Sequence, residues 1–130
     1  MATIRAVDDE PLTCKILEIS LSRLGHEVLT TTSGLAGLEL VQQARPSLVI
    51  LDLVLPDVDG LEMLQQIRKI APQTVVIIFT AWGSEHIERK ASNLGAHAVL
   101  QKGRVPGLLR STVSKILETQ AATSSNRGSL

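Results

Sequence analysis

The chain has 130 residues, in which 13 lysines and arginines balance 13 aspartates and glutamates, and it contains three histidines and one cysteine. This length favours one domain with a sizeable core, and a single cysteine excludes both an internal disulfide and a cysteine-based zinc site. The balanced charge argues against direct binding to nucleic acid or to an anionic membrane. The longest apolar run, residues 75–79, is too short to cross a membrane, and the N-terminal residues lack the pattern of a signal peptide, so we expect a cytoplasmic location.

Short apolar runs rich in β-branched residues alternate with helical patterns along almost the whole chain. This alternation predicts an α/β domain built on a parallel sheet. The third and fourth runs are continuously apolar, which is typical of central strands that helices cover on both faces. In chain order, the predicted strands are residues 3–7, 27–31, 48–51, 75–79 and 98–100.

A helix is predicted after each strand, and each helix has at least one residue that marks a boundary. Pro11 suits the first turn of the first helix, and Gly25 suits the turn that follows it. Ser33 is the candidate N-cap of the second helix, which has to end before Pro46. The later boundary residues are Pro72 after the third helix (residues 61–71), Ser84 and Gly95 around the fourth, and Pro106 at the start of the fifth.

We expect the domain to cover residues 1–120, because the last ten residues differ from it in composition. Residues 121–130, with the sequence AATSSNRGSL, are mostly small and polar. Such a segment has few apolar side chains that would hold it against a core. The composition therefore predicts a disordered tail or a linker stub over these residues.

Polar side chains follow four of the five predicted strands. Asp8 and Asp9 follow the first strand, Asp52 follows the third, Thr80 follows the fourth, and Lys102 follows the fifth after one intervening residue. The carboxyl ends of parallel strands lie at one edge of a sheet, and ligands of open α/β sheets bind in the crevice there. We therefore interpret these positions as one site.

Three aspartates that converge on a small crevice repel one another, so the arrangement requires a cation. Oxygen ligands without clustered histidine or cysteine indicate a hard ion, and Mg²⁺ is favoured because it combines one or two carboxylates with water and a phosphate oxygen. A phosphoryl group brought to Asp52 would then have its oxygens neutralised by the metal, Lys102 and Thr80. In that chemistry Asp52 is the nucleophile.

Four motifs occur in order on the predicted elements: VDDEP at residues 7–11, LDLVLPDVDG at 51–60, Thr80-Ala81, and Gly95-Ala96 followed by Lys102. With these motifs, residues 3–119 resemble a response-regulator receiver domain, the CheY-like phosphoprotein module of two-component phosphorelay signal transduction. The resemblance implies a flavodoxin-like, doubly wound sheet of five parallel strands in the order 2-1-3-4-5, with five helices on both faces.

The resemblance also implies a role for each site residue. Asp52 becomes an aspartyl phosphate, and Thr80 and Lys102 bind its phosphoryl group. The implied ligands of Mg²⁺ are Asp9 directly, Asp8 through water, Asp52, and the backbone carbonyl of Val54.

By the same resemblance, the phosphoryl group comes from a phosphohistidine on a histidine kinase or a histidine phosphotransfer protein. The transfer is Mg²⁺-dependent, and it changes the surface of the domain for an output protein or domain that the sequence does not identify. A dimer that forms on phosphorylation is compatible with this interpretation. The chain is therefore expected to be a signalling switch and not an enzyme, since it assists only its own phosphoryl transfer and hydrolysis.

Four residues depart from the family pattern. Gly103 stands where members usually have a proline in a cis peptide, which predicts a loop of different shape. Val99 replaces the usual tyrosine or phenylalanine, so a switch here has to use a smaller repacking. Val54 and Trp82 occupy positions that help to admit or orient the hydrolytic water in the family, and these two side chains predict slow loss of the phosphoryl group.

Two other functions stay open from the residues. The first is a receiver-like interaction module that acts mainly by binding proteins, with little phosphorylation, and Gly103 and Val99 favour it. The second is a hydrolase of the aspartyl-phosphate type, but Val54 stands where such an enzyme needs a second acid. The DVDG sequence at residues 57–60 resembles the nucleophile motif of another phosphatase class, yet it follows Pro56 and not a strand, so we interpret it as a turn before the third helix.

Overall fold

The computed structural model describes residues 2–81, 83–103 and 107–128, and within them five parallel strands form one sheet. The strands are β1 (Thr3–Val7), β2 (Glu27–Thr31), β3 (Leu48–Leu51), β4 (Val75–Thr80) and β5 (Ala98–Gln101). Their order is β2-β1-β3-β4-β5, and every neighbouring pair is parallel. The predicted flavodoxin-like strand order is thereby confirmed.

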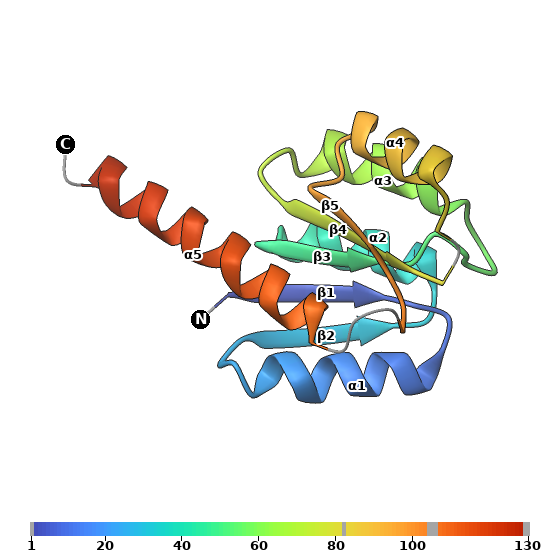
Figure 1. The fold of residues 1–130 in the computed structure, drawn as a ribbon, viewed down its shortest axis with the longest axis horizontal. Helices are drawn as coiled ribbons and strands as arrows, with labels where there is room; N and C mark the ends of the chain where they lie inside the picture. The colour runs from blue at the N-terminus through green and yellow to red at the C-terminus, as the bar shows by residue number, and fades with distance from the viewer. Residues whose placement is uncertain (1, 82, 104–106, 129–130) are drawn as a thin grey trace.

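Helices cover both faces of this sheet (Figure 1). They are α1 (Pro11–Ser22), α2 (Gly34–Ala44), α3 (Gly60–Ile70), α4 (Glu85–Asn93) and α5 (Leu108–Gly128). The buried side chains fall into two clusters, one with α2, α3 and α4 and the other with α1 and α5. This division confirms a doubly wound α/β fold.

The central strands contribute side chains to both clusters, because successive residues of a strand point to opposite faces. In β4, Val76 and Ile78 pack on the face covered by α2, α3 and α4, whereas Val75 and Ile77 pack on the face covered by α1 and α5. All four are buried. The continuous apolar run therefore reflects two buried faces, as the sequence predicts.

Local sequence signals account for the helix boundaries. Pro11 occupies the first turn of α1, where its missing N–H costs no helical hydrogen bond. The Ser33 hydroxyl accepts a hydrogen bond from the N–H of Ala36 at 3.2 Å, and the Ser84 hydroxyl accepts one from Ile87 at 3.2 Å. Both predicted N-caps are therefore present.

The C-terminal helix is longer than the sequence analysis expects. The structure continues α5 to Gly128, so residues 121–128 are helical where a disordered tail is predicted from composition. No glycine or proline occurs between Leu108 and Gly128, and two alanines, the best helix formers, open the segment. Pro106, the predicted start of this helix, lies outside the described residues.

Within the part of the chain that the structure describes, no helix is long and apolar enough to cross a lipid bilayer.

Candidate functional site

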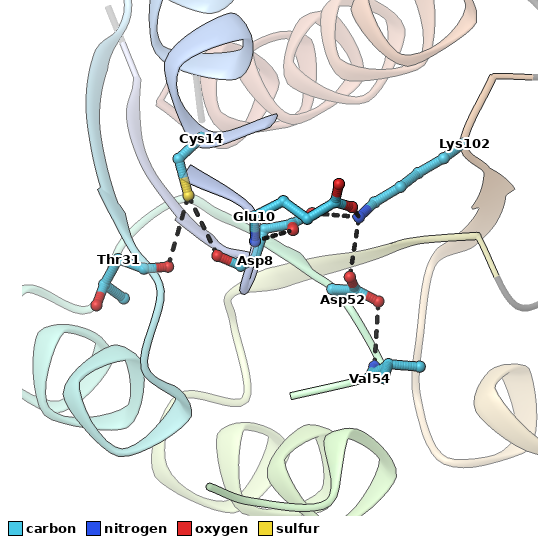
Figure 2. A network of polar contacts seen from close by, with 7 residues as sticks. All are labelled: Asp8, Glu10, Cys14, Thr31, Asp52, Val54 and Lys102. Carbon is cyan, nitrogen blue, oxygen red and sulfur yellow. Dashed lines mark hydrogen bonds and ion pairs between the residues drawn. The ribbon is translucent and has the colours of Figure 1, made fainter. Parts of the chain in front are cut away.

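Polar side chains from three strand ends meet at the carboxyl edge of the sheet (Figure 2). The Nζ of Lys102, one residue after β5, lies 2.7 Å from Oδ2 of Asp8 and 2.9 Å from Oδ2 of Asp52. It also lies 3.2 Å from Oε1 of Glu10. The structure thus brings Lys102 into contact with residues that lie 50 to 94 positions earlier in the chain.

Backbone groups fix the two buried carboxylates. Asp8 and Asp52 are 2% and 4% exposed. The second oxygen of Asp8 accepts a hydrogen bond from the N–H of Glu10 at 3.0 Å, and that of Asp52 accepts one from the N–H of Val54 at 3.1 Å. Each aspartate therefore presents one oxygen to its own loop and the other to Lys102.

A cysteine thiol also supports the first strand end (Figure 2). The Sγ of Cys14, buried on α1, donates to the carbonyl oxygen of Asp8 at 3.3 Å and lies 3.7 Å from that of Thr31. The thiol therefore links α1 to the ends of β1 and β2 at the backbone of Asp8. Burial raises the pKa of Cys14, which favours this neutral donor form.

The charges in this crevice shift one another's protonation. Burial lowers the pKa of Lys102, but its hydrogen bonds to Asp8 and Asp52 and their negative charges outweigh burial and raise it above its usual range. Burial raises the pKa of Asp8. The hydrogen bonds from Lys102 and from the N–H of Glu10 lower this pKa, but it stays above its usual value. The ammonium is therefore charged, and it does not fully offset the cost of burying Asp8.

The acidic residues have the chemistry of a site for a hard cation. Asp8, Asp9 and Glu10 can each direct a carboxylate oxygen into a space where these atoms lie within 4.8 Å of one another. Asp9 and Glu10 are exposed, so solvent reaches this side of the crevice. An all-oxygen donor set of this kind fits Mg²⁺. Glu10 is not among the predicted site residues, although it stands in the same acidic triplet as Asp8 and Asp9.

Thr80 and Val54 lie next to this cluster. Thr80 is the last residue of β4, is 1% exposed, and accepts a hydrogen bond from the N–H of Lys102 on its carbonyl oxygen at 2.9 Å. Val54 follows Asp52 by two residues, and its side chain is half exposed. The structure places both at the expected edge of the sheet, and their roles toward phosphate and metal stay predictions.

Comparison with known proteins identifies the family. The model of the response regulator receiver domain matches residues 4–114, a range that contains every residue of the cluster. The chain belongs to this family. It is thus a receiver domain of the kind found in two-component response regulators, and such domains generally bind Mg²⁺ at an acidic pocket like the one formed by Asp8, Asp9 and Glu10.

Similar proteins agree with this assignment. The chain is 40% identical over 81 residues to the transcriptional regulatory protein AfsQ1 of Streptomyces coelicolor, covering 62% of this chain and 36% of that protein. It is 32% identical to the transcriptional regulatory protein GlrR of Escherichia coli, covering 97% of this chain and 28% of GlrR. The receiver domain therefore spans only about a third of the length of these relatives.

Solved receiver domains share the fold. A CheY-like receiver domain protein from Methanospirillum hungatei superposes with a TM-score of 0.88 at 26% identity, covering 95% of this chain and 98% of that one. The BeF3-activated receiver domain of DrrB gives a TM-score of 0.82 at 30% identity, covering 91% and 98% of the two chains. The flavodoxin-like receiver fold is thus confirmed.

A hollow lies where this receiver domain has valine in place of the usual aromatic residue. It has a volume of about 550 Å³, and its lining includes Val99, Thr80, Gln101, Ser84 and Glu85. Val99 is half-buried, and it lines this hollow together with polar and apolar residues. Trp82, the other residue predicted to affect the phosphoryl group, lies outside the described residues.

The loop after Lys102 differs in shape from one that begins with proline. Gly103 has a φ of 75°, in the left-handed region, whereas a proline ring holds φ near −65°. This φ agrees with the expectation that the loop has a different shape. Gly103 is exposed, and a Cβ built on it meets nothing within 4 Å, so only the backbone conformation favours glycine here.

We expect Gly103→Pro to destabilise this receiver domain although it restores the usual family residue. Alanine at this φ should cost about 1 kcal/mol of unfolding free energy, and proline should cost more because its φ is incompatible. Urea unfolding of the wild type, Gly103→Ala and Gly103→Pro measures the order of their unfolding free energies. A proline variant as stable as the wild type would show that the loop does not hold Gly103 at a positive φ.

Proposed function

We propose that residues 1–120 form a receiver domain that accepts a phosphoryl group on Asp52 from a phosphohistidine of a histidine kinase or a histidine phosphotransfer protein. The reaction is Mg²⁺-dependent, and its product changes the surface that the domain presents to an output partner. The observation that carries this proposal is the convergence of Lys102 on Asp52 and Asp8, at 2.9 and 2.7 Å. Such a site can both hold a carboxylate nucleophile and neutralise a phosphoryl group.

The transfer uses the Asp52 carboxylate as the nucleophile. A carboxylate oxygen forms a bond to phosphorus while the P–N bond to the donor imidazole breaks, and the electron pair of that bond leaves on the imidazole nitrogen. The N–H of Val54, 3.1 Å from Oδ1, holds the carboxylate in one orientation. No separate side chain is assigned to activate Asp52, because a carboxylate oxygen is itself the nucleophile in aspartyl-phosphate chemistry.

Negative charge spreads over the phosphoryl oxygens during this step, and positive charge has to lie against it. Lys102 supplies one such charge from within 2.9 Å of Asp52. Mg²⁺ held by Asp8, Asp9, Asp52 and the Val54 carbonyl would add a Lewis acid at the same oxygens. The Thr80 hydroxyl, at the end of the neighbouring strand, would donate a hydrogen bond to a phosphoryl oxygen.

An apolar surface beside the site suits a protein donor. Leu12 and Ile16, on α1, are 72% and 57% exposed, and Leu108, at the start of α5, is 39% exposed. Between α1 and α5 lies a hollow of about 420 Å³ whose lining includes Ile16, Leu108 and Lys102. A partner that covers these side chains would bring its own residue next to Lys102, which supports a protein phosphohistidine as the donor.

The product supports a role as a switch. Phosphorylation replaces the carboxylate of Asp52 by an acyl phosphate that carries about −1.5 to −2 charges at neutral pH, next to the acidic residues that already outnumber Lys102. This charge would be compensated by Lys102, Thr80 and Mg²⁺, and their movement would alter the adjoining surface. Phosphorylation-dependent dimer formation would be one outcome, and we assign no catalytic turnover of other substrates to the domain.

A second function is favoured by Gly103 and Val99. Gly103 gives the loop after Lys102 a shape that proline would not allow, and Val99 leaves a hollow beside Thr80. Both differences would suit a receiver domain that acts mainly by binding other proteins, with little phosphorylation. The two functions differ in whether Asp52 becomes modified.

Incubation with acetyl phosphate and Mg²⁺, followed by intact mass measurement, tests the proposal. We expect the wild type to gain one phosphoryl group, and Asp52→Asn and a chelator-treated sample to gain none. Mg²⁺ binding without any gain of mass would instead support the binding module. Steady turnover of unrelated phosphoesters would indicate a hydrolase.

A further inference from the structure

The loop between β3 and α3 is attached to the start of α2 through one carboxylate. Oδ1 of Asp57 accepts a hydrogen bond from the N–H of Gly34 at 2.9 Å. Its Oδ2 accepts one from the Ser33 hydroxyl at 2.8 Å and one from the N–H of Leu35 at 3.1 Å. Helix α2 is therefore capped by a residue more than 20 positions further along the chain, in addition to its own N-cap.

These contacts favour the charged form of Asp57. The N–H groups of Leu35 and Gly34, followed by the Ser33 hydroxyl, hold the pKa of this carboxyl below its usual range. The start of a helix also carries a partial positive charge that attracts an anion. Asp57 is therefore ionised and directed at α2 across the physiological pH range.

Close packing between the loop and the start of α2 accompanies the hydrogen bonds of Asp57. A side chain at Gly34 would overlap the side chain of Val58 and would lie 3.2 Å from Leu55. Only a glycine at this position lets the loop lie directly against the first turn of α2. Hydrogen bonds and close packing therefore fix the tip of the loop, residues 55–58, to a helix that belongs to another part of the chain.

The other end of the same loop carries the phosphoryl-accepting residue. Val54 donates its N–H to Asp52 and pairs with Asp59 in an isolated antiparallel bridge (Figure 2 shows the first contact). A side chain at Gly60 would overlap the backbone of Leu53, so the start of α3 presses on the residue that follows Asp52. The loop is thus held at its base by α3 and at its tip by α2.

We propose that Asp57 is a positioning residue, which holds the backbone of the β3–α3 loop, and with it the Val54 carbonyl, in the orientation that Mg²⁺ binding requires. This inference rests on the proposed function of the site. Asp57 directs its carboxylate at α2 and has no part in the transfer itself. Its effect reaches the site through the backbone between residues 54 and 57.

The expected loss of Mg²⁺ affinity can be judged from other proteins, in which residues outside the coordination sphere orient the metal ligands. Their loss typically weakens metal binding about 10- to 100-fold. Asp57 acts through a few backbone bonds, and the Val54–Asp59 bridge remains in its absence, so we expect the lower end of this range. Asp57→Ala should weaken Mg²⁺ binding about tenfold, and Asp57→Asn, which keeps one acceptor oxygen, should have a smaller effect.

A matched control separates positioning from a general loss of helix capping. Asp59 lies on the same loop, is exposed, and caps only its own helix by accepting from the N–H of Leu61 at 2.8 Å. Asp59→Ala therefore removes a comparable cap without touching α2. We expect it to leave the Mg²⁺ affinity within about twofold of the wild type, because the backbone bridge to Val54 remains.

The experiment is calorimetric titration with Mg²⁺ of the wild type, Asp57→Ala, Asp57→Asn and Asp59→Ala, with urea unfolding of each protein measured in parallel. Phosphorylation by acetyl phosphate should recover in Asp57→Ala at saturating Mg²⁺, since Asp52 and Lys102 are intact. Unchanged Mg²⁺ affinity in Asp57→Ala, or an equal loss in Asp59→Ala, would overturn the positioning role. Failure of the wild type to bind Mg²⁺ would overturn the proposed function and this inference with it. If Asp57→Ala does not fold, Asp57→Asn against Asp59→Ala decides the question.

Discussion

Lys102→Met is expected to lower the free energy of unfolding by about 3 kcal/mol at neutral pH. Lys102 has a side chain that is 13% exposed, and it contacts carboxylates whose side chains are 2% and 5% exposed, in Asp8 and Asp52. Methionine preserves the length and most of the volume of the side chain but removes the charge. Two buried carboxylates then lose the ammonium that compensates them, and this uncompensated burial is the source of the cost.

The pH dependence identifies the cause. In the wild type, the raised pKa of Lys102 contributes stability that is fully present below its ordinary pKa of 10.5 and is lost as pH rises through the folded-state value. In the variant, Asp8 loses a partner that lowers its pKa, so the folded state binds a proton that the unfolded state releases above about 3.8. The deficit of Lys102→Met should therefore shrink as the pH falls from 7 towards 4.

Urea unfolding of the wild type and Lys102→Met at several pH values measures this effect. Lys15→Met, a change at an exposed lysine of α1, is the matched control and should alter the unfolding free energy by no more than about 0.5 kcal/mol. Mg²⁺ should restore part of the loss in Lys102→Met, because a cation in the acidic cluster replaces the missing charge. A loss that is independent of both pH and Mg²⁺ would indicate that Lys102 stabilises the fold by packing alone.

The strand ends show why much of the site is predictable from the sequence. Apolar runs fix the positions of β1 and β3, and the parallel connections bring the residues after them to one edge, so Asp8, Asp52 and Lys102 converge without any knowledge of their contacts. The same reasoning misses Asp57. Its partners lie more than 20 residues earlier and belong to a helix start, and no periodicity relates a loop residue to such a distant cap.

Two other features of the structure do not follow from the sequence analysis. Residues 121–128 are mostly small and polar, and such residues suggest disorder because they bury little apolar area. The two alanines that open this segment nevertheless permit α5 to continue to Gly128, since no earlier glycine or proline in the helix stops it. Arg5 lies inside a correctly predicted strand, but the sequence pattern makes no prediction about its exposure. In the structure, both faces of β1 are covered, so Arg5 is only 5% exposed.

Arg5→Met is expected to raise the free energy of unfolding by about 1–3 kcal/mol. Arg5 lies in register with Leu29 of β2 and with Val49 of β3, a buried residue of the cluster under α2, α3 and α4. Its Nη1 donates to the carbonyl of Ile4 at 3.2 Å, but its buried Nε has no hydrogen-bond partner among the described residues. Methionine fills most of the same space with no polar atom to satisfy.

The ion pairs of the structure explain why burial of the Arg5 charge lowers the stability of the fold. Every ion pair among the described residues involves Lys102, so in this part of the chain no carboxylate lies within 4.0 Å of the Arg5 guanidinium. Burying a charge without a counter-ion is unfavourable, and methionine removes that charge while it keeps an unbranched side chain in the same space.

Urea unfolding measures the gain in unfolding free energy of Arg5→Met, provided that the slope against urea concentration is unchanged. Arg5→Lys is the comparison variant. Lysine keeps a charge on a flexible stem and can lose its proton when buried, so this variant should gain less than methionine at neutral pH and should become relatively more stable as pH rises. A methionine variant less stable than the wild type would mean that the guanidinium is compensated after all. Since Arg5 lies on β1, three residues before Asp8, which follows the strand, Mg²⁺ titration of Arg5→Met would then show whether that compensation also sets the position of the first acidic residue of the site.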